Sequence, residues 1–249
     1  MRKIKKLIVV VFVACLVPFN SGCNSNNNQK EINSNTISGK ILFKEPMSDG
    51  KAISGSDFVT LDPFYCTITP VGFQGSQAKF FGSTSKILIQ HDLGNIELFD
   101  AATKEKRIVY NTDAGLESSY YSTAFVDNSH FSIADFKKIC LVDIQSGKSV
   151  VVVNGACGIH SWCENGKVLY YSTDKKIYSY NIQTDEKTYI TDGINPNISS
   201  DGETLAYQKN NTLYVENLKS GKKWKYKYDP LYFCLSPDSK YVAVVEYWS

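Results

Sequence analysis

One short segment of the chain contains three residues that can bind a soft metal ion: Cys157, His160 and Cys163. Thiolate and imidazole groups are ligands that zinc accepts. The spacing Cys-x2-His-x2-Cys is not a familiar zinc pattern, however, and the sequence offers no evident fourth ligand. Because successive side chains of a strand point to opposite faces, His160 and Cys163 are expected to diverge. We therefore predict no metal and no cofactor, and we expect this segment to contain a loop residue and two packed thiols, or a disulfide.

Recognisable catalytic motifs are missing from the sequence. It contains no HExxH pair, no GxSxG elbow, no Walker loop and no EF-hand spacing. The other two histidines, His91 and His130, lie at or near predicted turns and are interpreted as surface residues. A Ser-His-Asp triad, or a carboxylate pair for glycoside hydrolysis, would have to assemble from separate strands. No catalytic residue is assigned from the sequence.

The charge balance gives no support to nucleic-acid binding. The formal net charge is +2, but the first 22 residues contain Arg2, Lys3, Lys5 and Lys6 and no acid. The remainder holds 23 basic and 25 acidic residues, a net charge of −2. Binding to a phosphate backbone depends on a basic excess. We therefore expect no nucleic-acid partner.

The N-terminus has the composition of an export signal. Residues 1–6 are basic, and residues 7–19 form an apolar stretch of 13 residues interrupted by Pro18. A spanning helix needs about 20 apolar residues, so this stretch fits a secretory signal peptide better. The next segment, Asn20-Ser21-Gly22-Cys23, resembles the lipobox of bacterial lipoproteins, in which small residues precede a lipidated cysteine. Asn20 departs from that family, which usually has an aliphatic residue there, and Cys15 is a rival cysteine.

The lipobox resemblance implies a signal peptide over residues 1–22 and a lipid on Cys23. Residues 23–36 start with that cysteine and continue as a polar stretch that cannot bury a face, so we expect a disordered tether. Residues 37–249 would form the folded domain, held by the lipid on the outer face of the bacterial cell membrane. The alternatives are secretion, if Cys23 is not modified, and an uncleaved anchor.

A sequence pattern with a period near forty residues fills the rest of the chain. Its turns lie 44, 37, 36 and 37 residues apart, at Thr84-Ser85, Asn128-Ser129, Asn165-Gly166, Asp201-Gly202 and Asp238-Ser239. Three residues before each turn stands an apolar residue, which we take as the repeat core: Phe81, Phe125, Trp162, Ile198 and Leu235. We expect each turn to close a two-residue hairpin, in which φ > 0 residues are needed.

A second recurring element follows in each copy. An Asp or Asn, 15 or 16 residues after the turn, precedes a polar turn and a lysine; these marker residues are Asp100, Asp143, Asn181 and Asn217. A further strand comes next, such as residues 150–153, four valines that we expect to be buried on both faces. Each copy therefore predicts four strands. A period near forty built from four strands is typical of an all-β β-propeller, with one blade per copy; a β-sandwich with regular turns is the alternative.

The last copy lacks its marker, which would fall beyond Ser249. Half a blade would leave an unpaired edge, so we expect strands within residues 37–44, 57–61 and 65–69 to complete it and give five blades. If those strands form a blade of their own, there are six sectors and the last is incomplete. A truncated chain is the third alternative.

Residues 197–207 and 235–243 resemble the SPDG-K-x-hydrophobic-A element of TolB-like and WD-type propeller repeats, with Ser239 in place of the usual Gly. The resemblance implies a propeller fold and no particular activity; TolB-like domains bind protein partners. We therefore expect a monomeric binding scaffold for an unknown protein or small molecule. The alternative is a propeller hydrolase or lyase acting on envelope or extracellular polysaccharide or peptide.

Overall fold

The computed structural model describes residues 41–44, 47–48, 51–52, 58–62, 67–70, 77–80, 86–91, 95–100, 103–111, 122–134, 137–155, 157–226, 230–235, 239–240 and 242–246. The predicted signal peptide and tether, with Cys23, lie outside these residues, and so does Phe81. The chain divides into an N-terminal unit that ends at His160 and a C-terminal unit that begins at Ser161.

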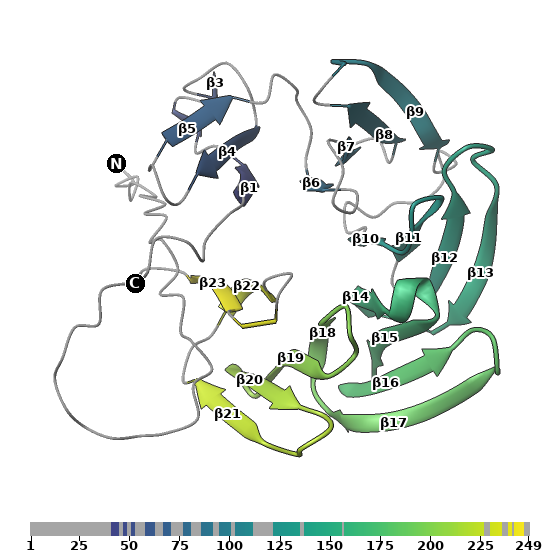
Figure 1. Ribbon diagram of the computed structural model, residues 1–249, viewed down its shortest axis with the longest axis vertical. Coiled ribbons are helices and arrows are strands. Elements are labelled where there is room, and N and C mark those ends of the chain that lie inside the picture. Colours follow the sequence, from purple (N-terminus) through teal and green to yellow (C-terminus); the bar gives the residue numbers. More distant parts are fainter. Residues whose placement is uncertain are drawn as a thin grey trace, which may run out of the picture. The chain divides into compact units, whose positions relative to one another are not determined.

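Four antiparallel sheets dominate the described chain, and each is built from four consecutive strands (Figure 1). The predicted all-β class and four-stranded repeat unit are thereby confirmed. The strands, in sheet order, are β6 (Gln77–Phe80), β7 (Lys86–Gln90), β8 (Asn95–Asp100) and β9 (Lys106–Asn111); β10 (Ser122–Phe125), β11 (His130–Ala134), β12 (Lys138–Asp143) and β13 (Ser149–Asn154); β14 (Cys157–Cys163), β15 (Val168–Thr173), β16 (Lys176–Asn181) and β17 (Glu186–Asp192); and β18 (Ile194–Ile198), β19 (Thr204–Lys209), β20 (Thr212–Asn217) and β21 (Lys223–Tyr226). A 3₁₀ turn, η1 (Glu164–Gly166), follows β14.

The remaining strands form smaller sheets. Strands β1 (Ile41–Lys44), β4 (Phe58–Asp62) and β5 (Thr67–Pro70) make a three-stranded sheet, and β2 (Met47–Ser48) pairs with β3 (Lys51–Ala52). Strands β22 (Pro230–Leu235) and β23 (Val242–Glu246) make a two-stranded sheet. The sequence predicted that N-terminal strands complete the last repeat. Within the N-terminal unit, β1, β4 and β5 pair with one another, as in the six-sector alternative, and within the C-terminal unit β22 pairs with β23. Closure of the last repeat by N-terminal strands stays a prediction.

Three of the five predicted two-residue hairpins, at residues 128–129, 165–166 and 201–202, were assigned to the wrong strand connection. The other two predicted turns contain Thr84, Ser85 and Asp238, which lie outside the described residues. The loops from the first to the second strand are longer and comprise residues 126–129, 164–167 and 199–203. Two-residue turns join the second strand to the third instead, at Asp174-Lys175 and Asn210-Asn211. These four residues have φ between 49° and 59°, the type I′ geometry that matches the twist of a tight hairpin.

Local hydrogen bonding explains why one predicted hairpin is longer. At Asp201-Gly202 the glycine has a φ of 75°, as the sequence predicted. The Asp201 carboxylate, however, accepts bonds from the Ser199 hydroxyl at 2.5 Å and from the Glu203 N–H at 3.0 Å. The Thr204 N–H also donates to the Ser199 hydroxyl. Asp and Asn side chains build wider turns in this way, which the pattern of turn residues alone does not reveal.

The recurring Asp or Asn caps the turn between the third and fourth strands. Asp143 Oδ1 accepts hydrogen bonds from the N–H and the hydroxyl of Ser146, both at 2.7 Å. Asn217 Oδ1 accepts the same two bonds from Ser220, at 2.8 and 2.7 Å. Four positions after the marker, φ is positive in each of the described four-stranded sheets: 64° at Lys104, 69° at Gly147, 59° at Asp185 and 70° at Gly221. The marker is therefore a turn-forming residue.

A β-bulge recurs at one repeat position in three sheets. The register with the fourth strand shifts after Ile96 in β8, after Ile139 in β12 and after Ile177 in β16. Each isoleucine stands four residues before its marker, and each is at most 1% exposed. Bulges bend a strand and increase its twist. Because these bulges recur at equivalent buried residues, the repeat is present in the structure as well as in the sequence.

Within each unit, neighbouring sheets pack face to face. In the N-terminal unit, Leu98 of β6–β9 and Phe131 of β10–β13 belong to one apolar cluster. In the C-terminal unit, Tyr170 of β14–β17 and Leu205 of β18–β21 belong to another. Val242 of β23 lies in a third cluster with residues of β18–β21. Burial of these apolar faces is the main favourable contribution to stability.

The four valines of β13 are not buried on both faces, contrary to the expectation from sequence. Val150 is 63% exposed and Val151 is 51% exposed. The reason is their place in the sheet, because β13 is the last strand in the order β10-β11-β12-β13. An edge strand has only one strand neighbour, so even a run of apolar residues remains partly in solvent.

Candidate binding site at a turn edge

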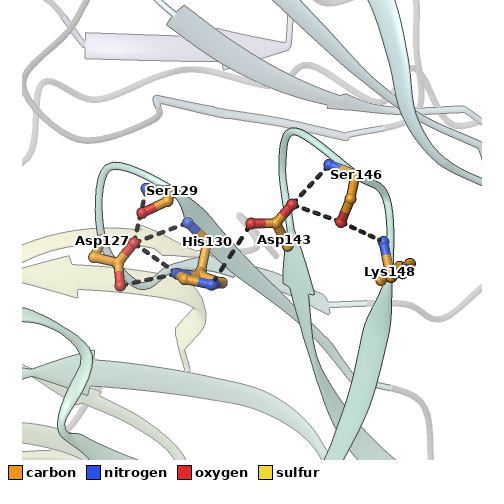
Figure 2. A network of polar contacts seen from close by, with 6 residues as sticks. All are labelled: Asp127, Ser129, His130, Asp143, Ser146 and Lys148. Atoms are coloured by element: carbon orange, nitrogen blue, oxygen red, sulfur yellow. Dashed lines mark hydrogen bonds and ion pairs between the residues drawn. The ribbon is translucent and has the colours of Figure 1, made fainter.

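Two turns of sheet β10–β13 bring a histidine and two carboxylates together. In an antiparallel sheet of consecutive strands, the first and third connections lie at the same end of the strands. We call this end of sheet β10–β13 the turn edge. Asp127 lies in the β10–β11 turn, His130 begins β11, and Asp143 ends β12 at the β12–β13 turn. Figure 2 shows the three side chains meeting at this edge, together with Ser146.

The His130 ring lies between the two carboxylates. Its Nδ1 atom is 3.0 Å from Asp127 Oδ1 and 3.1 Å from Oδ2, and its Nε2 atom is 3.8 Å from Asp143 Oδ2. Because an ionised carboxylate only accepts hydrogen bonds, Nδ1 carries the proton and donates it. The side chains of these three residues are 33–36% exposed. They are therefore accessible to a ligand.

Both carboxylates are held ionised. Partial burial by itself would raise the pKa of Asp127, but hydrogen bonds from the Ser129 N–H and from His130 outweigh it and hold the pKa below the usual value. The hydroxyl and N–H of Ser146 lower the pKa of Asp143. Two carboxylates beside one imidazole give the edge a negative charge at neutral pH. The group that this arrangement suits is a cation, such as a lysine or arginine side chain of a partner.

The structure describes the side chains of two residues of the candidate metal cluster, His160 and Cys163. His160 Nε2 lies 2.6 Å from the hydroxyl of Ser132, and its Nδ1 lies 3.2 Å from the Gly158 carbonyl. Burial raises the pKa of the Cys163 thiol to about 12, so the thiol is protonated at neutral pH and a poor metal ligand. The side chain of Cys157 lies outside the described residues. Within the described part of the chain, no group of three His, Cys, Asp or Glu side chains is placed to hold a metal ion.

Ser132 and His160 have the separation of a nucleophile and its general base. An activated serine needs such a histidine within hydrogen-bond reach. Ser132, however, is 0% exposed and His160 is 3% exposed, and the group beside Nδ1 is a carbonyl oxygen. At this depth the bond holds β11 against the middle of β14.

The repeat-core residues occupy similar environments wherever the structure describes them. Trp162 and Ile198 are buried. Phe125 and Leu235 are half-buried and pack against the apolar clusters of the N-terminal and C-terminal units respectively.

Asp127 is the site residue that the sequence interpretation missed. His130 was assigned to the surface and Asp143 to the repeat, while their convergence was not foreseen. The available signal was the spacing of Asp127 and His130, because an Asp commonly accepts N–H bonds from residues two and three positions later. The structure has both bonds, from Ser129 at 2.7 Å and His130 at 2.9 Å.

Comparison of the sequence with protein-family models and with curated proteins found no match. In the part of the chain that the structure describes, no helix is long and apolar enough to cross a lipid bilayer.

Proposed function

We propose that this chain is an exported lipoprotein whose β-propeller acts as a binding scaffold, tethered to the outer face of the cell membrane through Cys23. Its partner is a protein or small ligand that presents a cationic group to the turn edge at His130. The propeller and the lipobox rest on the sequence pattern described above, and the TolB-like and WD-type repeats are the families it resembles.

The observation that carries this proposal is a side-chain bond repeated between successive sheets. The Ile198 N–H donates to the Ser161 hydroxyl at 2.9 Å, and the Leu235 N–H donates to Asn197 Oδ1 at 2.8 Å. Ser161 and Asn197 both stand four residues before a repeat turn, and both acceptors bind the repeat-core residue of the following copy. First strands of successive sheets thus lie side by side in one repeating arrangement. Such an arrangement is expected when equivalent blades surround an axis.

The turn edge supports a binding role because its frame is fixed by bonds within the turns. The Asp143 carboxylate accepts two hydrogen bonds from Ser146, and the Asp127 carboxylate accepts hydrogen bonds from two backbone N–H groups. A site held in place before binding loses little conformational entropy when a ligand arrives. The exposed carboxylates then select for positive charge.

A photo-crosslinking residue at Gln145 tests the binding surface in the intact cell. Gln145 is exposed in the turn that Asp143 caps, and Lys219 occupies the equivalent exposed position in sheet β18–β21. We expect a crosslinked adduct of defined mass from position 145 and none from position 219. Asp143→Asn should lower the yield severalfold, because it removes a charge while Asn217 shows that asparagine caps the same turn. Equal adducts at both positions, or a yield that Asp143→Asn leaves unchanged, would contradict the assigned surface.

Metabolic labelling with a fatty-acid analogue tests the tether independently. We expect label on the wild-type chain and none on Cys23→Ala, which should also leave the membrane fraction. Label that persists in Cys23→Ala would contradict lipidation at this cysteine without bearing on the binding surface.

A further inference from the structure

The four outer strands of the described four-stranded sheets differ at one repeat position. Strands β9, β13, β17 and β21 are each the last strand of a sheet. Six residues after the marker, three of them carry a lysine: Lys106, Lys187 and Lys223. In β13 the residue is Ser149, and the strand from Ser149 to Asn154 contains no charged side chain.

The three lysines are fixed to the sheets that carry them. Lys187 Nζ lies 4.1 Å from the centre of the Tyr178 ring, and Lys106 Nζ lies 5.7 Å from that of Phe99. Lys223 forms a 2.9 Å ion pair with Glu216. Charges on an edge strand, lysine above all, prevent a second strand from pairing with it. Three outer strands are protected in this way, and β13 is not.

The exposed side chains of β13 favour pairing. Val150 and Val151 are 63% and 51% exposed. The position of Val151, eight residues after the marker, is occupied by Lys225 in β21. An uncharged edge with β-branched side chains has the character of a strand-pairing surface.

The hydrogen-bond ladder shows which backbone groups face the open edge. The Asp143 N–H donates to the Lys148 carbonyl at 2.9 Å, so this pair is a hydrogen-bonded one. Hydrogen-bonded and non-hydrogen-bonded pairs alternate along an antiparallel ladder. The pair of Cys140 and Val151, three steps along, is therefore non-hydrogen-bonded. It follows that the N–H and C=O of Val151 point away from β12, toward the open edge.

We propose that β13 pairs with β13 of a second copy of this chain, antiparallel, about a two-fold axis at Val151. Only residues whose backbone groups point outward can face each other in a hydrogen-bonded pair, and an axis at Val151 meets that condition. Val151 then faces its own counterpart and Val150 faces Val152 of the other copy. A second copy is the occupant because the strand has no charge that would select a partner of opposite sign, whereas valine against valine is complementary by symmetry. This proposal departs from the sequence-based expectation of a monomer.

Charge exchange at Val151 tests the pairing. Full chains with two different affinity tags are expressed together, and the amount of one copy that is purified with the other is measured. Val151→Lys on both copies places like charges opposite each other, as does Val151→Glu on both. We expect either variant to lower co-purification at least about tenfold, and one copy of each variant together to restore it. The equivalent exposed residue of β9, Ile108, provides the control, since Ile108→Lys should have no effect.

A second variant guards against misfolding of the first. Ser149→Lys introduces the lysine that the other outer strands already carry, so it is compatible with the fold and should also reduce co-purification. Restoration by the mixed Lys and Glu pair cannot result from misfolding. Wild-type copies that do not co-purify would overturn the proposal and leave the edge to an extended segment of another protein. Co-purification that Val151→Lys leaves unchanged, or that the mixed pair does not restore, would overturn it as well.

Discussion

Sheets β10–β13 and β18–β21 share one backbone plan and differ in what its turns carry. Asp143 and Asn217 cap equivalent turns with the same two bonds from a serine three residues later. Beside the first turn, His130 lies between two carboxylates. At the position equivalent to His130, which pairs with the marker, the other sheet has Thr204. The residue before it, Glu203, forms a 3.4 Å surface ion pair with Lys219. The hydrogen bonds within the turns fix the backbone conformation in both sheets, whereas the charged side chains beside the turns differ.

The interiors of the same two sheets differ in a similar way. Tyr207 and Tyr214 stack in β18–β21, with ring centres 5.4 Å apart and planes inclined by 13°. The equivalent pair in β10–β13 is Ile133 and Cys140, which are both buried. One backbone arrangement thus accommodates two stacked tyrosines or a smaller pair of isoleucine and cysteine, provided that the neighbouring sheet fills the remaining volume.

The largest effect should come from a glycine position that sheets β10–β13 and β14–β17 share. Gly155 and Gly193 each donate their N–H to a carbonyl of the turn before the third strand. At Gly193, with a φ of 154°, an added Cβ would lie 2.7 Å from Tyr207 Cδ2, whereas nothing lies within 4 Å at Gly155. We expect Gly193→Ala to cost about 3 kcal/mol of unfolding free energy and Gly155→Ala about 1 kcal/mol, measured by denaturant unfolding. Equal losses would contradict the close approach.

The next largest effect concerns the bond between successive sheets. Ser161→Ala removes the acceptor of the Ile198 N–H, and its own bond to the Pro196 carbonyl at 3.1 Å. Leaving a buried N–H without an acceptor costs about 1–3 kcal/mol. Ser146→Ala, in an exposed turn, is the control and should cost about 0.5 kcal/mol. Denaturant unfolding compares the two, and a Ser161→Ala loss no greater than that of the control would show that the bond is dispensable.

The sequence predicted these features unevenly. The marker residues and the four-strand unit followed from spacing, because turn chemistry is local and Asp or Asn side chains act within a few residues. The prediction of a two-residue hairpin at Asp201 was wrong, because the Asp201 carboxylate interacts with Ser199 and Glu203. The spacing of turn residues does not indicate such bonds. The prediction that Val150 is buried was wrong, because the position of a strand within its sheet, rather than hydrophobicity, decides exposure at an edge strand. The His130 cluster joins two turns and required the strand pairing to be known.

A third prediction uses the exchange of Asp143 and Asn217. Hydrogen bonds lower the pKa of Asp143 below its usual value of 3.8, so the folded state favours the ionised form. The stabilisation is therefore present above the unfolded pKa and is lost as the pH falls through the folded pKa. Asp143→Asn should retain its stability at neutral pH and lose less of it on acidification from about pH 5 to pH 3 than the wild type does.

Asn217→Asp should change acid sensitivity in the opposite direction, because it introduces a carboxylate into the same pair of serine bonds. Thermal unfolding as a function of pH measures both variants. If both variants change the loss of stability at acidic pH in the same direction, the two turns are not equivalent.

The smallest effect belongs to the surface ion pair of β18–β21. Lys219 and Glu203 have side chains that are 78% and 47% exposed, so water and salt screen their attraction. Lys219→Gln should change the unfolding free energy by at most about 0.5 kcal/mol, and added salt should remove the difference in denaturant unfolding. A larger loss of unfolding free energy would show that Lys219 and Glu203 belong to a connected network of polar contacts, as His130 does.

A crystal structure of the mature chain tests the central claim, that the repeated sheets are equivalent blades, more directly than any variant. Our account predicts the sheets arranged around one axis, with β10, β14 and β18 innermost and the bond between Ser161 and Ile198 recurring in form from blade to blade. Two stacked layers of sheet, with these first strands dispersed, would contradict it.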